Sequence, residues 1–198
     1  MSYVAASDVV AYGEFDDAAS DVPLLGTLIP LVQAAIDGYT GRTFESDSDD
    51  VASHYFTVDE DTLDLTLYLD DDLAAISSVY SGSVNMAGQY VTVPRNKTPY
   101  YALKLKDVAS HDWSDGTDSD GSYDGAIIVT GNWAYSTTAP NDIKLVALKL
   151  TYLAYKQRVG LEQTTQPVMT PSGAMILPAR WPADVLQMLE PYRKRFVV

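Results

Sequence analysis

The sequence predicts an α+β fold in which N-terminal and C-terminal helices pack together as a helical body with a small antiparallel β module inserted. Apolar residues recur at three- and four-residue steps near both ends of the chain, which is the period of amphipathic helices. Between them, short alternating or β-branched runs are separated by turn-forming residues. We therefore expect N-terminal helices in residues 1–50, the β module in 51–138 and C-terminal helices in 139–198.

Size and composition indicate a folded protein. The chain has 198 residues, of which 46% are hydrophobic and 11% aromatic, enough for one sizeable core or a compact core plus a smaller module. Cysteine is absent, which excludes disulfides and thiolate zinc sites. The N-terminus lacks the basic and apolar segments of a secretion signal, and no apolar run approaches the roughly 20 residues that cross a bilayer. We expect a soluble protein with no membrane contact.

Charge is distributed unevenly along the chain. The formal net charge is −14, and the first 72 residues hold 17 acidic residues against one basic residue. The stretch from Pro140 holds 8 basic and 4 acidic residues. This polarity would let unlike ends of neighbouring subunits attract each other, but a solvated acidic surface explains it equally well. Tight nucleic-acid binding is disfavoured, because neutralising phosphates requires a basic face.

The N-terminal part predicts two helices. Ser7 is placed to cap a short helix through Tyr12. A longer helix is expected from Asp21 to Tyr39, where Pro30 predicts a kink or a restart and Gly41 a left-handed end. One buried stripe is expected along this helix, made of Leu24, Leu28, Leu31, Val32, Ala35 and Tyr39.

The middle of the chain predicts strands. Arg42 is expected to face the terminal carbonyls of the preceding helix, and the acidic, serine-rich stretch Glu45–Asp50 reads as a mobile linker. From Leu63 to Leu69, leucines alternate with polar residues, which predicts one strand with its leucines facing a core. Further strands are expected at Ala75–Tyr80, Gln89–Val93, Tyr100–Leu105 and Ala126–Trp133, forming a small antiparallel sheet or sandwich.

The C-terminal part predicts two more helices. Pro140 opens the first, Asp142 suits the positive end of its dipole, and Gly160 is expected to end it. A long loop or hairpin follows over 164–178, then a last helix over Pro182–Leu189. The expected inward-facing residues are Ile143, Val146, Ala147, Leu150, Leu153 and Ala154 in the first helix, and Val185, Leu186 and Leu189 in the last.

Motifs for catalysis are scarce. The histidines, His54 and His111, lie in polar surroundings that predict exposed loop positions. No serine sits in a nucleophile-elbow pattern, and no glycine-rich phosphate-binding motif is present. Carboxylate pairs follow from the abundance of acids. We expect no enzyme, no catalytic residues and no cofactor.

The aspartate-rich segment 111–125 suggests two interpretations. Its carboxylates and carbonyls are the ligands that calcium prefers. The EF-hand register fails, however, because placing Asp118, Asp120 and Gly121 at the third, fifth and sixth positions leaves Gly116 at the first, and no glutamate stands at the twelfth. A flexible hairpin loop without metal, disordered in the free protomer over Asp112–Asp124, is the favoured interpretation.

Aromatic residues also allow two interpretations. A carbohydrate-binding platform is one, built from Trp113, Trp133, Tyr100, Tyr101 and Tyr135. Aromatic side chains are ordinary occupants of sheet faces, however, and Trp133, beside a glycine in a predicted strand, reads as a core residue.

An ordered series of segments resembles the head-to-tail connector, or adaptor, proteins of tailed bacteriophages and prophages. The series covers most of the chain in the right order. Its segments are the helix from Leu24 to Ile36, its ending Tyr39-Thr40-Gly41-Arg42-Thr43-Phe44, the strand Leu67-Tyr68-Leu69, the run Val129-Thr130-Gly131-Asn132-Trp133-Ala134-Tyr135, the helix start Pro140-Asn141-Asp142-Ile143-Lys144 and the close Leu189-Glu190-Pro191-Tyr192-Arg193.

The resemblance implies a structural virion protein, assembled in the host cytoplasm and located in the neck between capsid and tail. Copies of it would form a ring, commonly twelve-fold, beneath the portal protein. The ring would extend the DNA channel without binding DNA specifically, and would present a platform to a tail, stopper or neck protein. In such proteins the C-terminal segment engages the portal, which here nominates Tyr192, Arg193, Lys194, Arg195 and Phe196. The β module is larger than in smaller members, and its role stays open.

Two other classes of function were weighed against this one. A non-catalytic β-rich binding module, using glycan or calcium contacts on a tail or surface, is the alternative. A hydrolase using carboxylates ranks last, because no motif supports it.

Overall fold

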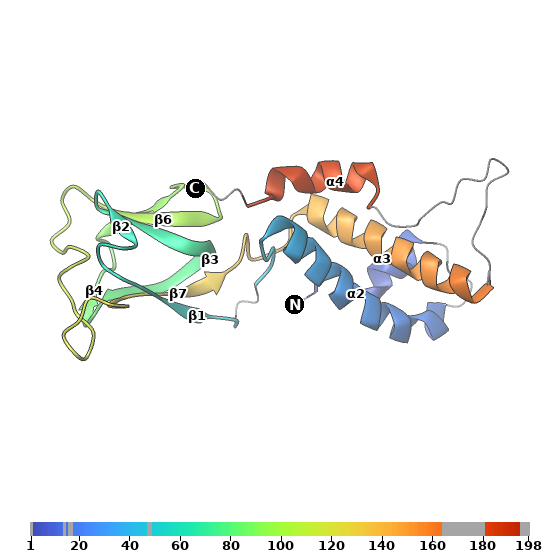
Figure 1. The fold of residues 1–198 in the computed structure, drawn as a ribbon, viewed down its shortest axis with the longest axis horizontal. Helices are drawn as coiled ribbons and strands as arrows, with labels where there is room; N and C mark the ends of the chain where they lie inside the picture. Colours follow the sequence, from blue (N-terminus) through green and yellow to red (C-terminus); the bar gives the residue numbers. More distant parts are fainter. Residues whose placement is uncertain (1, 14, 16–17, 47–48, 164–180, 195–198) are drawn as a thin grey trace. The chain divides into compact units, whose positions relative to one another are not determined.

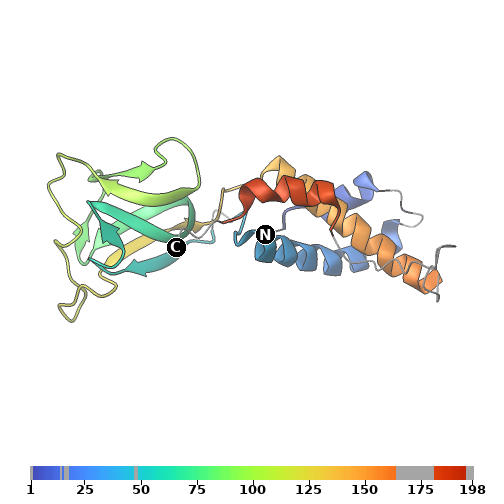
Figure 2. The ribbon, with the colours of Figure 1, turned by 45° about the horizontal axis from the view of Figure 1, so that its top comes forward.

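The structure is a computed structural model that describes residues 2–13, 15, 18–46, 49–163 and 181–194 (Figure 1). It separates into two compact units. The helical unit comprises Ser2–Gly41 and Pro140–Val198, and the β unit comprises Arg42–Ala139. Both the predicted α+β class and the insertion of a β module between helices are confirmed. Figure 2 shows the same two units from a second direction.

The first helix, α1, runs from Ala6 to Tyr12 and begins one residue before the expected cap. Ala5 holds the N-cap position, and its backbone N–H donates to the carboxylate of Asp8 at 2.8 Å. The predicted cap Ser7 lies inside the helix instead. Asp8 in the first turn thus accepts the backbone N–H of the N-cap residue, and no side chain of Ala5 caps the helix N–H groups as the predicted hydroxyl would.

The second helix, α2, spans Ala18–Thr40 and continues through Pro23 and Pro30 without the predicted restart. From Val22 onward, its buried residues are Leu25, Ile29, Ile36 and Thr40. The predicted stripe was only partly right, since Leu31 is 63% exposed and Ala35 is exposed, whereas Leu24, Leu28, Val32 and Tyr39 are half-buried. The physical reason is that this segment is apolar on every face, so the periodicity of its hydrophobic residues does not select one of them.

The composition of α2 also corrects the expectation that no apolar run approaches membrane length. The stretch Val22–Thr40 reaches a mean hydropathy of 1.3, so that by length and composition it could cross a membrane. This is weak evidence, because core helices pass the same test. Only 22% of the most apolar part of this stretch is buried. Much of an apolar helix is therefore left on the surface.

The end of α2 confirms one prediction. Gly41 has a φ of +67°, and its N–H donates to the Asp37 carbonyl at 2.7 Å, which is the expected left-handed ending. The guanidinium of the next residue, Arg42, forms an ion pair with Asp72 inside the β unit.

Two C-terminal helices complete the helical unit. Helix α3 (Asn141–Gln163) packs against α2, and α4 (Ala183–Leu189) packs against α3 and continues into a short 3-10 turn, η1 (Glu190–Tyr192). Gly160 does not end α3 as predicted, because a single glycine costs a helix only about 1 kcal/mol. The predicted loop over 164–178 lies outside the described residues. The buried residues of these helices include Ile143, Val146, Ala147, Leu150, Val185 and Leu189, as expected.

Seven antiparallel strands build the β unit. They are β1 (Ala52–Phe56), β2 (Thr62–Leu63), β3 (Thr66–Ser81), β4 (Val84–Asn85), β5 (Tyr90–Val93), β6 (Tyr100–Leu105) and β7 (Ile127–Trp133). The sheet has the order β1-β7-β3-β6-β5, and the short strands β2 and β4 also pair with β3. The long strand β3 therefore pairs with four of the other strands: β2, β4, β6 and β7.

The leucine alternation from Leu63 to Leu69 is a tight hairpin rather than one strand. Asp64 and Leu65 both have positive φ, 49° and 64°, between paired strands β2 and β3. Two consecutive positive φ values define the two-residue turn that matches the twist of a hairpin. Leu67 is buried as predicted, but Leu63 is 63% exposed. Alternation continues across a turn of this kind, so the pattern alone could not show the reversal.

Strand β3 joins two segments that the sequence predicted as separate strands. Its register against β6 shifts between Tyr68 and Leu73, which is a bulge. The bulge contains three consecutive aspartates, Asp70, Asp71 and Asp72. Asp70 contacts His54, Asp71 accepts the backbone N–H of Asp72, and Asp72 pairs with Arg42.

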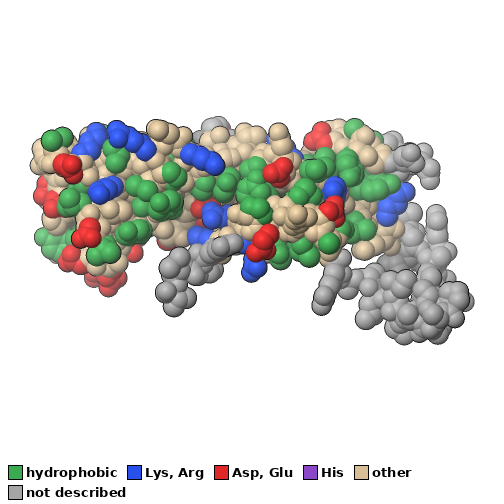
Figure 3. All heavy atoms as spheres, turned by 90° about the horizontal axis from the view of Figure 1, so that it is seen from above, with side chains coloured by type: hydrophobic (Ala, Val, Ile, Leu, Met, Phe, Trp, Pro, Cys, Tyr) green, Lys and Arg blue, Asp and Glu red, His purple; other side chains and the backbone are tan. Residues whose placement is uncertain are grey.

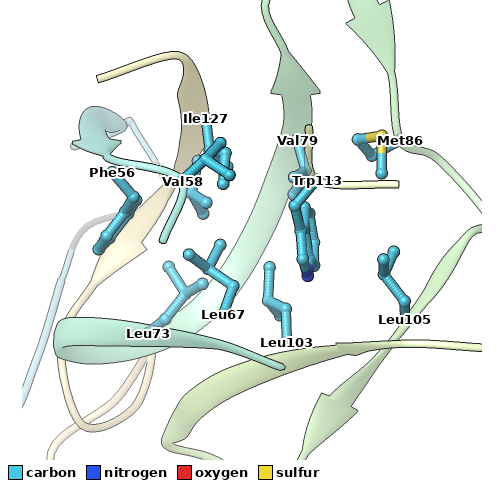
Figure 4. Close-up of a cluster of buried hydrophobic side chains, with 11 residues drawn as sticks. Phe56, Val58, Leu67, Leu73, Val79, Met86, Leu103, Leu105, Trp113 and Ile127 are labelled. Carbon is cyan, nitrogen blue, oxygen red and sulfur yellow. The ribbon is translucent and has the colours of Figure 1, made fainter. Parts of the chain in front are cut away.

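The core of the β unit lies inside this sheet. Figure 4 shows its side chains converging from the strands, with Trp113 from the long 106–126 loop among them. The cluster consists of Phe56, Val58, Leu67, Leu73, Val79, Met86, Leu103, Leu105, Trp113, Ile127 and Val129. The β unit therefore has a hydrophobic core of its own.

Gly131 in β7 predicts a measurable stability effect. A Cβ there would lie 2.2 Å from the Ala75 carbonyl oxygen and 2.9 Å from Leu73 Cδ1. We expect Gly131→Ala to lower the free energy of unfolding by about 1–3 kcal/mol, the usual cost of overpacking. Urea unfolding followed by circular dichroism measures this. Gly38→Ala is the control: its Cβ meets nothing within 4 Å, and it should stabilise α2 by about 0.5–1 kcal/mol. A Gly131→Ala protein as stable as the parent would contradict the packing.

Candidate assembly surfaces

The first three of the predicted portal-docking residues, Tyr192, Arg193 and Lys194, belong to the helical unit. The backbone N–H of Lys194 donates to the carbonyl of Thr40 at 2.8 Å, at the end of α2. The Tyr192 hydroxyl lies 3.3 Å from a carboxylate oxygen of Asp142, near the start of α3. Up to Lys194 the chain is thus held against two helix ends and is not a loose tail.

Arg193 lies on the same surface and is exposed. Its guanidinium is 5.4 Å from the ring centre of Tyr39 and 3.7 Å from a carboxylate oxygen of Glu190. A guanidinium over an aromatic face is attracted by the ring quadrupole. The other two nominated residues, Arg195 and Phe196, lie outside the described residues. The docking role of all five stays a prediction.

The second surface is the exposed side of α2. Its exposed residues recur in a four-residue spacing, which places them along one side of the helix. They are Val22, Pro23, Gly26, Thr27, Pro30, Leu31, Ala34, Ala35 and Gly38. From Val22 to Ile36 the helix has no charged residue on any face. We call this set the α2 face.

The α2 face differs from an ordinary solvent-facing helix surface, which carries charged and polar side chains. It offers small and apolar side chains, and exposed apolar patches of this kind mark sites of contact with another macromolecule. Sequence reasoning missed the face because it assigned Leu31 and Ala35 to the core. The signal that would have found it is the absence of charge across four helical turns.

A third feature is a cluster of residues from the first and last segments of the β unit in sequence. The Thr43 carbonyl accepts the backbone N–H of Tyr135 at 2.8 Å. The ring of Phe44, which is fully buried, packs 5.6 Å from the ring of Tyr135. The Arg42 guanidinium lies 5.7 Å from the same ring and pairs with Asp72. Two segments on which the family resemblance rests thus meet in space.

This cluster revises the view of Glu45–Asp50 as a mobile linker. Glu45 forms a parallel bridge with Ser136, and the side-chain amide of Asn132 donates to the Asp50 carbonyl at 3.1 Å. Residues 47–48 between them lie outside the described part. The two ends of the segment are therefore fixed to β7 and to the chain that directly follows it.

His54 lies in strand β1 rather than in the predicted loop. Its ring stacks on the indole of Trp133, with ring centres 3.7 Å apart and planes 11° apart, and its Nδ1 is 2.9 Å from Asp70. Trp133 packs against the core but is only half-buried. The His54 ring is thus held between Trp133 of β7 and Asp70 of β3.

The aspartate-rich segment is a loop, as expected, but it is anchored. Trp113 is 2% exposed, and its indole N–H donates to the Leu65 carbonyl at 3.0 Å. His111 lies in the loop and is 2.9 Å from Asp115, and this hydrogen bond lowers the pKa of the Asp115 carboxyl. Among the described residues, no group of three or more His, Asp or Glu side chains is placed to hold a metal ion.

Comparison with known proteins adds a likeness in fold. No protein-family model matches the chain, and no curated protein matches it. A chain from a structure of the neck of an empty GTA particle, computed with C6 symmetry, superimposes with a TM-score of 0.57. The two sequences are 13% identical, and the alignment covers 99% of this chain and 92% of the other. The chain therefore shares its fold with this neighbour.

At this identity the comparison shows the shared fold and not a shared site. The likeness in fold extends to both units, because both fall within the aligned 99% of this chain. The neighbour's neck was computed with six-fold symmetry.

Proposed function

We propose that this protein is a structural virion component, a head-to-tail connector (adaptor) in the neck of a phage or phage-like particle. Copies would form a ring beneath a portal protein, extend the DNA channel and provide a platform for a tail, stopper or neck protein. The observation that carries this proposal is the likeness in fold, over almost the entire chain, to a chain of a particle neck. The ordered series of connector-like segments supports it independently.

The surfaces of the helical unit suit a ring. In a closed ring each subunit is held on two sides by heterologous contacts, so each contact can be small. The α2 face is a long uncharged strip that a neighbouring subunit would cover. A ring of six or twelve copies would agree with the six-fold symmetry of the neighbour's neck. The ring role is a property of surfaces and requires no catalytic group.

The charge of the protein suits passage of DNA. With 17 acidic and 5 basic residues, the β unit carries a net charge of −12 of the total −14. Attraction to phosphates needs clustered basic side chains, which a channel that must release DNA should lack. Any part of the acidic surface that faces the channel would keep the duplex from adhering.

Mixing the purified protein with a purified portal ring tests the proposal. We expect the protein to join the portal as a ring, seen by negative-stain electron microscopy and by a matching mass in size-exclusion chromatography with light scattering. Gln157→Arg, an exposed change on α3, should join equally well. A protein that stays monomeric beside portals from its own particle would refute the connector role.

A further inference from the structure

The β unit contains an open cavity of about 750 Å³ that the connector role does not use. Its walls are formed by the turn between β3 and β4, the long 106–126 loop, and neighbouring positions of strands β1 and β7. Its lining residues are Tyr55, Gly82, Ser83, Asp115, Gly116, Thr117, Asp118, Ser119, Asp124, Gly125, Ala126 and Ile128.

One wall of the cavity is fixed by direct backbone packing. A Cβ on Gly116 would lie 1.8 Å from the Ser81 carbonyl oxygen, and a Cβ on Gly82 would lie 2.2 Å from that of Thr117. The Ser81 hydroxyl donates to the Trp113 carbonyl at 2.7 Å and accepts the Gly116 N–H at 3.1 Å. Because Trp113 is in the core, this part of the loop is held in place before any ligand arrives.

The opposite rim is also held. The Gly125 N–H donates to the Thr57 hydroxyl at 3.1 Å. The Asp118 carboxylate accepts the backbone N–H groups of Asp120 and Ser122 at 2.9 and 2.8 Å. A cavity formed in advance loses little entropy when it binds a ligand, which favours affinity.

The lining is negatively charged. It contains three carboxylates, Asp115, Asp118 and Asp124, and no lysine or arginine. Figure 3 shows acidic side chains gathered at one end of the β unit. The Asp118 carboxylate already accepts hydrogen bonds from the loop backbone, and the Asp115 carboxylate already bonds to His111. A broad negative surface of this kind suits a lysine or arginine side chain better than a bare metal ion.

The cavity also has an aromatic and an aliphatic wall. Tyr55 on β1 is 66% exposed, and it stands directly opposite Ile128 on β7, which in turn stands opposite Tyr80 on β3. The long aliphatic stem of a basic side chain packs on such a row. Its charged end is attracted to a tyrosine face.

The strand beside the cavity is open on one side. Among the described strands, β1 pairs only with β7 and ends the sheet order. An edge strand presents unpaired backbone N–H and C=O groups, which an extended peptide can satisfy by adding a strand. Since Tyr55 belongs to β1 and also lines the cavity, an added strand would run directly past it.

We propose that the β1 edge and this cavity together bind an extended, basic segment of a partner protein. The segment pairs with β1, and a lysine or arginine side chain crosses Tyr55 to reach the carboxylates. Charge complementarity selects this occupant, because the β unit carries 17 acidic and 5 basic residues. The inference goes beyond the connector role and does not depend on it.

Nuclear magnetic resonance titration of the ¹⁵N-labelled full chain tests this, with an acetylated, amidated Val-Lys-Val-Lys-Val-Lys peptide as the probe. We expect saturable shifts confined to β1 and the cavity lining, weakened by salt. The double variant Asp115→Asn with Asp124→Asn should bind about tenfold or more weakly, as loss of charge-assisted contacts predicts. Asp107→Asn, an exposed change outside the cavity lining, should bind as the parent does.

Other outcomes would overturn the proposal. A Val-Gln-Val-Gln-Val-Gln peptide that binds equally well would remove the role of charge. Shifts spread evenly over the acidic surface would remove the site. Calcium chloride or a mixed oligosaccharide panel saturating the cavity while the basic peptide does not would assign it to a metal or a glycan. Concentration-dependent shifts of the same resonances without peptide would assign it to a second copy of this chain.

Discussion

Leu31→Arg is expected to abolish ring formation on the portal while leaving the fold intact. Leu31 is 63% exposed on α2, in the middle of a surface without charge. In the free subunit the arginine would remain in water and cost little. In the ring it would be buried without a partner, which costs several kcal/mol. Each 1.4 kcal/mol is a factor of ten in affinity, so the contact should weaken by more than about a hundredfold.

Electron microscopy and light scattering of portal mixtures measure this effect, and a circular dichroism melt checks the fold. The matched control is Gln157→Arg, which introduces the same side chain at an exposed position of α3. Normal rings from both variants would show that the α2 face is not the contact between subunits. The connector role would then survive with a different interface.

Trp113→Ala is expected to cause the largest loss of stability. The side chain fills the core of the β unit, and its indole N–H donates to the Leu65 carbonyl. Truncating a buried tryptophan to alanine costs about 3–5 kcal/mol, because contacts are lost and a cavity remains. Loss of this anchor should also release the loop that forms the acidic cavity.

Urea unfolding followed by circular dichroism measures the loss, and amide hydrogen exchange in the 106–126 loop measures the release. Trp133→Ala is the control, since that side chain is half-buried and stacks on His54. Its effect should be clearly smaller. A Trp113→Ala protein within about 1 kcal/mol of the parent, with the loop still protected, would show that the tryptophan is not the anchor.

Several elements could be predicted because their signals are local. Gly41 ends α2 in a left-handed conformation, as a glycine after a helix suggests. The strand Tyr100–Leu105 and the helix after Pro140 follow from alternation and from the helical period. Short-range chemistry decides each of these, so the residues beside them contain the information.

Other features could not be predicted, because distant residues decide them. Nothing near Arg42 in sequence points to Asp72, thirty positions later in the bulge of β3. From the sequence alone Trp113 is a loop residue, and only the folded sheet shows that its side chain belongs to the core. The choice of the buried side of α2 depends on where α1 and α3 pack, since all of its faces are apolar.

By itself, the sequence determined that helices flank a β module. The spacing of apolar residues changes along the chain from a period of about 3.6 to a period of 2 and back again. The sequence also determined where the acidic residues lie along the chain. Only the tertiary structure decided which apolar residues stay exposed, which carboxylates share a cavity and which loop is anchored. The physical reason is that burial and charge proximity are properties of pairs of surfaces, and folding alone brings those surfaces together.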